Sequence, residues 1–124
     1  MQIDFTTTDC DELSASLRKT DKSYCQLDSG PFFGHWCRLE LPGVTIVKEE
    51  RSGRLSTAAA ISPDALVAAV SIRQRGTMLC EGHAHESSVL VIGRPNTRPL
   101  FSTPPDFENY AIEFDIKTLR RTAE

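Results

Sequence analysis

The chain has 124 residues, of which 40% are hydrophobic and 25% are charged, and its formal net charge is −3. This length and composition predict one globular domain, residues 1–124, with a core large enough to fold without disulfides. The slightly negative charge argues against a surface that grips a nucleic-acid backbone, because such surfaces gather Lys and Arg.

The cysteines and the N-terminus indicate a reducing compartment. Cys10, Cys25, Cys37 and Cys80 form no Cys-x-x-Cys pair, which disfavours a zinc knuckle or a redox motif. Residues 1–13 are acidic and lack the apolar core of a signal peptide. We therefore expect a cytoplasmic protein with free thiols. No apolar run is long enough to span a bilayer.

The first predicted element is a helix over residues 8–19. Asp9 is its expected N-cap, and Glu12, three residues on, completes a capping box. Cys10, Leu13 and Leu17 follow at helical spacing and form a narrow apolar stripe. We expect this helix to lie on the surface of the domain with its polar side in water.

Short alternating segments separated by Gly, Pro and Asp predict strands over residues 23–29, 33–41, 44–51 and 55–61. In the second of these, Trp36, Arg38 and Glu40 share one face, and His35, Cys37, Leu39 and Leu41 share the other. The charged run at residues 48–51 is interpreted as the solvated end of a strand.

Residues 65–95 contain three short apolar runs, with turns predicted at residues 75–76 and 81–82. We interpret them as an antiparallel meander at the centre of a sheet. A short strand at residues 100–102 and a proline-rich loop come next. In residues 110–116, aromatic and aliphatic side chains alternate with small and acidic ones, as in a half-buried strand. Asp115 is the expected N-cap of a terminal helix.

About eight or nine short strands, with breaks every 8–12 residues or so, are typical of a sandwich or barrel. The predicted fold class is therefore all-β with peripheral helices: an antiparallel β-barrel with a short N-terminal helix and a C-terminal helix.

His83-Ala84-His85 is the first candidate for chemistry. Two histidines at alternate strand positions face the same side and can chelate a metal, with His35 as a distant third ligand. The spacing departs from the first motif of metal-binding cupins, because Glu86 follows His85 directly. The pair also comes just after a predicted turn. We favour exposed turn histidines and no metal, and keep a small metal-dependent cupin enzyme as the alternative.

Trp36 and Arg38 are the second candidate. An aromatic ring and a cation on one strand face suit a small polar or anionic ligand, although the same pair can stack on the outer surface. Gln26, on the preceding predicted strand, is a further ligand-binding candidate. Phosphate-binding loops and Ser-His-Asp arrangements are absent, and Cys80 beside His83 has no evident partner. An enzyme is therefore not expected, and no cofactor is predicted.

Three segments resemble the N-terminal cupin-like domain of AraC/XylS-type bacterial transcription regulators. They are YCQLDSGPFFGHWCRLELPGVTIVKEE, SIRQRGTMLCEG and SSVLVIGRPNTRPLFSTPPDFENYAIEFDIKTL, which together extend from Tyr24 to Leu119. The resemblance implies a cupin-like barrel that senses a small-molecule effector, mediates dimerisation, or does both. DNA would be bound only by a separate helix-turn-helix domain, which this chain does not include.

The resemblance also implies a homodimer, whose contact would involve Ile116, Leu119 and Arg120 of the terminal helix. The effector would bind inside the barrel without a metal. A structural domain whose barrel is filled by its own side chains is a further alternative.

Overall fold

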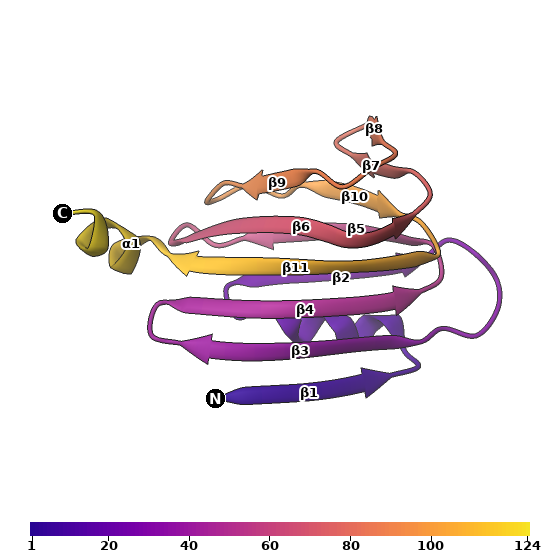
Figure 1. Cartoon of the computed structure of the whole chain (residues 1–124), viewed down its shortest axis with the longest axis horizontal. Helices are drawn as coiled ribbons and strands as arrows, with labels where there is room; N and C mark the ends of the chain where they lie inside the picture. The colour runs from indigo at the N-terminus through magenta and orange to yellow at the C-terminus, as the bar shows by residue number, and fades with distance from the viewer.

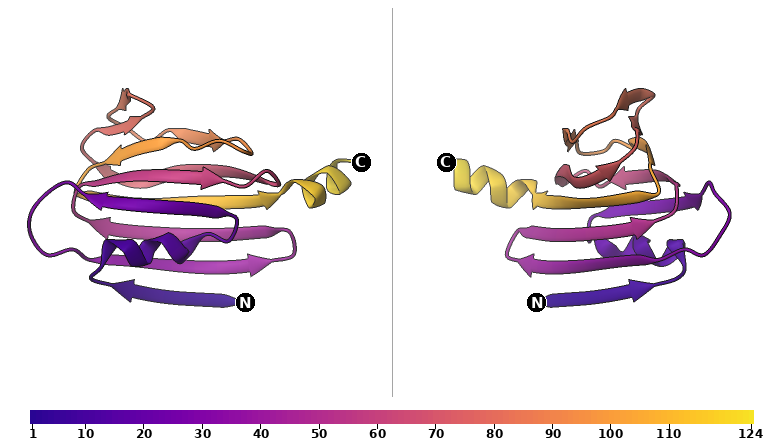
Figure 2. Two further views of the ribbon diagram at one scale, coloured as in Figure 1. Left: turned by 180° about the vertical axis from the view of Figure 1, so that it is seen from behind. Right: turned by 45° about the vertical axis from the view of Figure 1, so that its right-hand side comes forward.

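The computed structural model describes residues 1–124, which form two antiparallel sheets that face each other (Figures 1 and 2). In spatial order, the six-stranded sheet contains β1 (Gln2–Thr7), β3 (Gly34–Leu41), β4 (Val44–Ser52), β11 (Asp106–Asp115), β6 (Ala65–Arg75) and β9 (Leu90–Gly93). The five-stranded sheet contains β2 (Thr20–Gln26), β5 (Leu55–Ile61), β10 (Leu100–Thr103), β7 (Met78–Cys80) and β8 (His83–His85).

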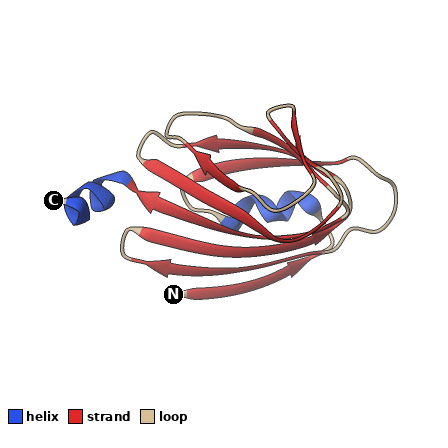
Figure 3. Ribbon diagram, turned by 45° about the horizontal axis from the view of Figure 1, so that its top comes forward, coloured by secondary structure: helices blue, strands red, loops and turns tan.

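The predicted all-β class is confirmed: the chain forms antiparallel sheets with peripheral helices. Figure 3 shows the strands of both sheets curving around one interior. The N-terminal strand β1 was not predicted. Its sequence is largely polar, yet it pairs with β3 along its whole length.

The N-terminal helix is shorter than the predicted span of residues 8–19. It is a 3-10 helix, η1 (Cys10–Ser16), that packs against β2 and β3. Asp9 is its N-cap, as predicted. The capping box does not form, because the Glu12 carboxylate accepts a hydrogen bond from the hydroxyl of Thr7 at 2.7 Å.

A tertiary contact explains why the helix ends early. The carboxylate of Glu113, on β11, accepts the backbone N–H groups of Arg18 and Lys19 at 3.2 and 2.8 Å. Those donors would otherwise bond within a continuing helix. Leu17 is instead extended and leads the chain into β2.

Residues 65–95 do not form the predicted central meander. β6 and β9 pair directly in one sheet, whereas the β7–β8 hairpin belongs to the other. Gly76 stands where the chain leaves β6, with φ +128° and Pro104 so close that a Cβ there would lie 2.9 Å from it. This turn therefore directs the chain into the second sheet. The turn predicted at residues 81–82 is confirmed, with positive φ at Glu81 and Gly82.

The alternation in β11 runs opposite to the expected burial. Ala111 and Glu113 are buried, while Tyr110 is 38% exposed. In β3, Trp36 and Arg38 face the interior. Alternation identifies residues that share a face, but it does not say which face the second sheet covers.

The terminal helix α1 (Ile116–Ala123) projects beyond the end of β11 (Figure 1). The Asp115 carboxylate accepts the N–H of Thr118 at 3.0 Å, which confirms the predicted cap. None of the α1 residues is buried. No helix of the structure has the length and apolar character that crossing a membrane requires.

Candidate functional site

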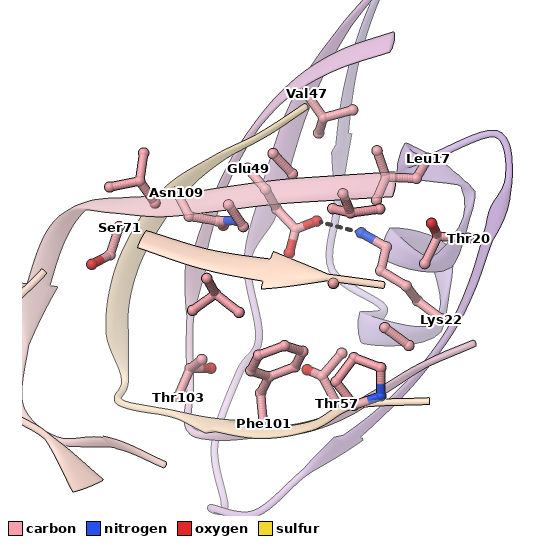
Figure 4. Close-up of a pocket in the computed structure, with 18 of the residues that line it drawn as sticks. Leu17, Thr20, Lys22, Val47, Glu49, Thr57, Ser71, Phe101, Thr103 and Asn109 are labelled. Atoms are coloured by element: carbon pink, nitrogen blue, oxygen red, sulfur yellow. Dashed lines mark hydrogen bonds and ion pairs between the residues drawn. The ribbon is translucent and has the colours of Figure 1, made fainter. Parts of the chain in front are cut away.

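A cavity of about 110 Å³ lies between the two sheets (Figure 4). Most of its lining is apolar and includes Ile61, Val67 and Phe107. The volume is on the scale of the 150 Å³ cavity that admits benzene in another protein. The cavity is thus large enough for a small organic molecule.

Three charged side chains form part of this wall: Lys22 of β2, and Glu49 and Arg51 of β4. Their side chains are only 9%, 3% and 6% exposed. The ammonium nitrogen of Lys22 lies 3.1 Å from Glu49 Oε2, the contact dashed in Figure 4. Arg51 Nη1 contacts the other carboxylate oxygen, to which the hydroxyl of Tyr24 donates at 3.0 Å. We call these four residues the charged cluster.

The charged cluster follows from strand periodicity. Glu49 and Arg51 occupy alternate positions of β4, as does Val47, so all three point inward. Lys22 and Tyr24 do the same on β2. The expectation that residues 48–51 are a solvated strand end is therefore wrong for Glu49 and Arg51.

Within the charged cluster, Glu49 and Lys22 are held in their charged forms. Burial alone would raise the pKa of the Glu49 carboxyl, but the attraction of Lys22 and Arg51 outweighs it and lowers this pKa to about 2. Burial likewise opposes the charge on Lys22, and the attraction of Glu49 overcomes it, so the pKa of Lys22 is raised. Two cations and one carboxylate leave the cavity wall with one uncompensated positive charge.

Three polar atoms in the cavity lining have no hydrogen-bond partner in the protein: Arg51 Nε, Thr57 Oγ1 and Asn109 Oδ1. Leaving a buried polar group unpaired costs about 1–3 kcal/mol. Because native structures rarely tolerate this cost without a reason, these atoms are candidate contacts for a polar ligand. Arg51 N–H supplies a donor, the Thr57 hydroxyl can donate or accept, and the Asn109 oxygen accepts.

The ligand-binding residues predicted from sequence lie elsewhere. Trp36 packs on Phe5, with ring centroids 5.3 Å apart, in the core beneath η1. Arg38 stacks over Trp36 and donates to the carbonyl of Ala15 at 2.6 Å. Gln26 donates to residues of the loop after β2. None of the three predicted residues lines the cavity, and their part in binding stays a prediction.

The structure does not bring the three histidines together. His83 and His85 are on β8, the edge strand of the five-stranded sheet. His35 is on β3 of the other sheet, with Nε2 2.7 Å from a carboxylate oxygen of Asp4. The alternative metal site of the sequence analysis would need ligands from separate parts of the molecule.

Sequence reasoning missed the charged cluster and Thr57. The available indication was charged or polar residues at alternate strand positions, as in Glu49-x-Arg51 and Lys22-x-Tyr24. The same pattern is typical of solvent-facing strands, so it does not identify an interior site by itself.

The fold and the cavity define a double-sheet β domain with a charged, ligand-sized interior. No family model matches the chain, and no curated protein matches it. The chain is similar to the EutQ protein of Clostridium difficile, with 13% identity, a TM-score of 0.45, and coverage of 73% of this chain and 76% of that one.

Two further solved structures are similar. A Cupin 2 conserved barrel domain protein from Salinispora arenicola shares 17% identity over 88% of this chain and 89% of its own, with a TM-score of 0.41. The plu4264 protein from Photorhabdus luminescens shares 16% identity over 91% of this chain and 92% of its own, with a TM-score of 0.36.

Proposed function

We propose that this domain binds a small organic anion in its interior cavity and acts as the sensor domain of an AraC-type transcription regulator. The observation that carries the binding proposal is the set of unpaired polar atoms on a cavity wall with an excess positive charge. The regulator role is supported by the resemblance of residues 24–119 to the sensor domains of that family.

The chemistry of the wall favours a carboxylate with an apolar remainder. One carboxylate oxygen would accept the free N–H of Arg51, and the other the hydroxyl of Thr57. The remainder would lie against the apolar lining, for example Ile61 and Phe107. A ligand that binds in this way pairs atoms that are unpaired in the protein and balances the extra charge.

A route from the cavity to α1 supports the regulatory part of the proposal. Thr20, in the cavity wall, donates its hydroxyl to Glu113 at 2.7 Å. Its neighbour Lys19 forms an ion pair with Asp115, the N-cap of α1, at 2.8 Å. A ligand that binds more tightly to one position of β2 would thereby bias the position of α1.

The test is a thermal-shift screen of small carboxylates, each paired with its uncharged amide. A carboxylate present at 100 times its Kd stabilises the protein by about 2.7 kcal/mol. We expect carboxylates to raise Tm and their amides not to, and Thr57→Val to reduce the rise. Equal shifts for acids and amides, or an undiminished shift in Thr57→Val, would contradict the proposed ligand class.

We also propose that the domain forms a homodimer. Side chains on the outward face of the six-stranded sheet form two apolar rows across the strands. One row is Leu41, Val44, Phe114 and Leu66, and the other is Leu39, Ile46, Ile112, Ala68 and Ile92. An apolar sheet face packs well against a like face, as a two-fold dimer requires.

The predicted dimer contact on α1 follows directly in sequence on a strand of this outer face. Phe114, at the end of β11, directly precedes the N-cap, and Leu119 on α1 is 40% exposed. Ile116 and Arg120 are likewise not buried. The dimer interface would therefore combine the outer sheet face with α1.

A further inference from the structure

Three potential metal ligands of different chemistry meet on the outer face of the six-stranded sheet, away from the cavity. They are Asp4 of β1 and His35 and Cys37 of β3. Asp4 is opposite Cys37 in the strand register, and His35 is two residues before Cys37 on the same face. Strand pairing thus places the three side chains next to one another.

The distances between the ligand atoms are close to those around zinc. Zn²⁺ binds N, O and S ligands at about 2.0–2.3 Å in a tetrahedron, which places ligand atoms about 3.3–3.6 Å apart. Cys37 Sγ lies 3.4 Å from Asp4 Oδ2 and 3.6 Å from His35 Nε2. The other carboxylate oxygen, Asp4 Oδ1, is hydrogen-bonded to His35 Nε2 at 2.7 Å, and this contact needs to open by about 0.6 Å to admit the ion.

The arrangement does not suit a nucleophilic triad. Such a triad requires the histidine to contact its base-orienting carboxylate with one ring nitrogen and its nucleophile with the other. Here Asp4 and Cys37 both face Nε2 of His35. Three side chains of this kind with ligand atoms within 4.8 Å of one another could instead hold a metal ion.

The neighbouring charges leave the three ligands available. Lys48, opposite Cys37, directs its ammonium to Glu108 at 3.0 Å. Glu50, opposite His35, is bound by Arg73 at 3.2 Å. Both of these neighbouring side chains are therefore paired with residues outside the group of three.

We propose that Asp4, His35 and Cys37 bind a Zn²⁺ ion, with the fourth position open to solvent. Thiolate and imidazole ligands favour Zn²⁺ over Mg²⁺ and Ca²⁺, which prefer oxygen. Because β1 is an edge strand that pairs with β3 alone, the ion would link the two strands and hold this edge in place.

The test uses the full chain without a polyhistidine tag, reduced and free of metal, titrated with Co²⁺ as a spectroscopic substitute. We expect one Co²⁺ per chain, with a thiolate-to-metal charge-transfer absorption and the visible bands of a tetrahedral site, both lost when Zn²⁺ is added. Cys37→Ser should abolish the charge-transfer absorption. Asp4→Asn and His35→Ala should each weaken Zn²⁺ binding more than about 100-fold, beyond the effect of losing an outer-shell partner.

Matched controls separate this site from the other thiols and histidines. Cys25→Ser removes an exposed thiol on β2, and the double variant His83→Ala, His85→Ala removes the pair on β8. All should bind Co²⁺ as the parent does, and circular dichroism checks that each variant is folded. The proposal is overturned if no charge-transfer absorption develops, if the absorption survives in Cys37→Ser, or if it disappears in either control.

Discussion

Each face of the six-stranded sheet carries side chains that are usually found on the other side of a sheet. The inner face carries Glu49, Arg51 and Glu113, all buried. The outer face exposes Leu39 and Ile92, the latter to 53%. Because buried charges cost free energy unless they are fully paired, their presence inside suggests a binding role for the cavity. Apolar residues outside suggest a partner for the outer face.

Removal of the buried carboxylate of Glu49 should have the largest effect of the substitutions that compare the two faces. Glu49→Ala leaves Lys22 and Arg51 as unpaired buried cations, so we expect the free energy of unfolding to fall by about 3–5 kcal/mol. Glu50→Ala is the matched control, since Glu50 is the next residue, faces outward and is partly exposed; it should cost less than about 1 kcal/mol. Urea denaturation measures both. Equal losses would mean that the inner charges contribute no more than surface ones.

Acid should lower the free energy of unfolding in a defined pH range. The pKa of Glu49 is about 2 in the folded protein and 4.5 for an ordinary Glu. A lowered pKa stabilises the fold fully above the ordinary value, and this contribution is lost as pH falls from about 4.5 to about 2. It amounts to about 3 kcal/mol. Urea denaturation across this range should show a shallower decline for Glu49→Gln than for the parent chain; an equal decline would assign the acid sensitivity to other groups.

Removal of the unpaired hydroxyl of Thr57 should increase the stability of the protein, unlike the loss of Glu49. Thr57→Val replaces an unpartnered buried hydroxyl with a methyl group, so it should stabilise the protein by about 1 kcal/mol. Thr103→Val is the control, because its hydroxyl accepts a hydrogen bond from Arg51 at 3.1 Å. That variant should destabilise by about 1 kcal/mol or more. Thermal unfolding compares the two, and a lowered Tm in Thr57→Val as well as in Thr103→Val would show that Thr57 has a partner in solution.

The smallest expected effect on stability comes from the outer face. Ile92→Lys should change the free energy of unfolding by no more than about 0.5 kcal/mol, because the side chain is exposed. It should nevertheless shift a homodimer toward monomer, as should Leu119→Asp on α1. Light scattering over a range of concentrations measures the ratio. A ratio unchanged in Ile92→Lys would remove the sheet face from the interface, and one unchanged in Leu119→Asp would remove α1.

Caps, turns and strands could be predicted from the sequence because each depends on a few neighbouring residues. The Asp9 and Asp115 caps, the turn at residues 81–82 and most strand positions follow from short-range patterns. The charged cluster was not predictable in this way. Lys22 and Glu49 are 27 residues apart in sequence and meet only because the two sheets face each other.

The sequence by itself determined that the chain is a set of short antiparallel strands with capped helices at its periphery, because turns, caps and alternation depend on adjacent residues. The tertiary structure alone decided which side of each strand is covered. Residues 65–95 were divided between two sheets by the turn at Gly76 and its close approach to Pro104. Glu49, on the inner face of β4, stays ionised because Lys22 and Arg51 lie beside it. Such contacts between distant segments leave no trace in the local pattern, because alternation is the same whichever face becomes the interior.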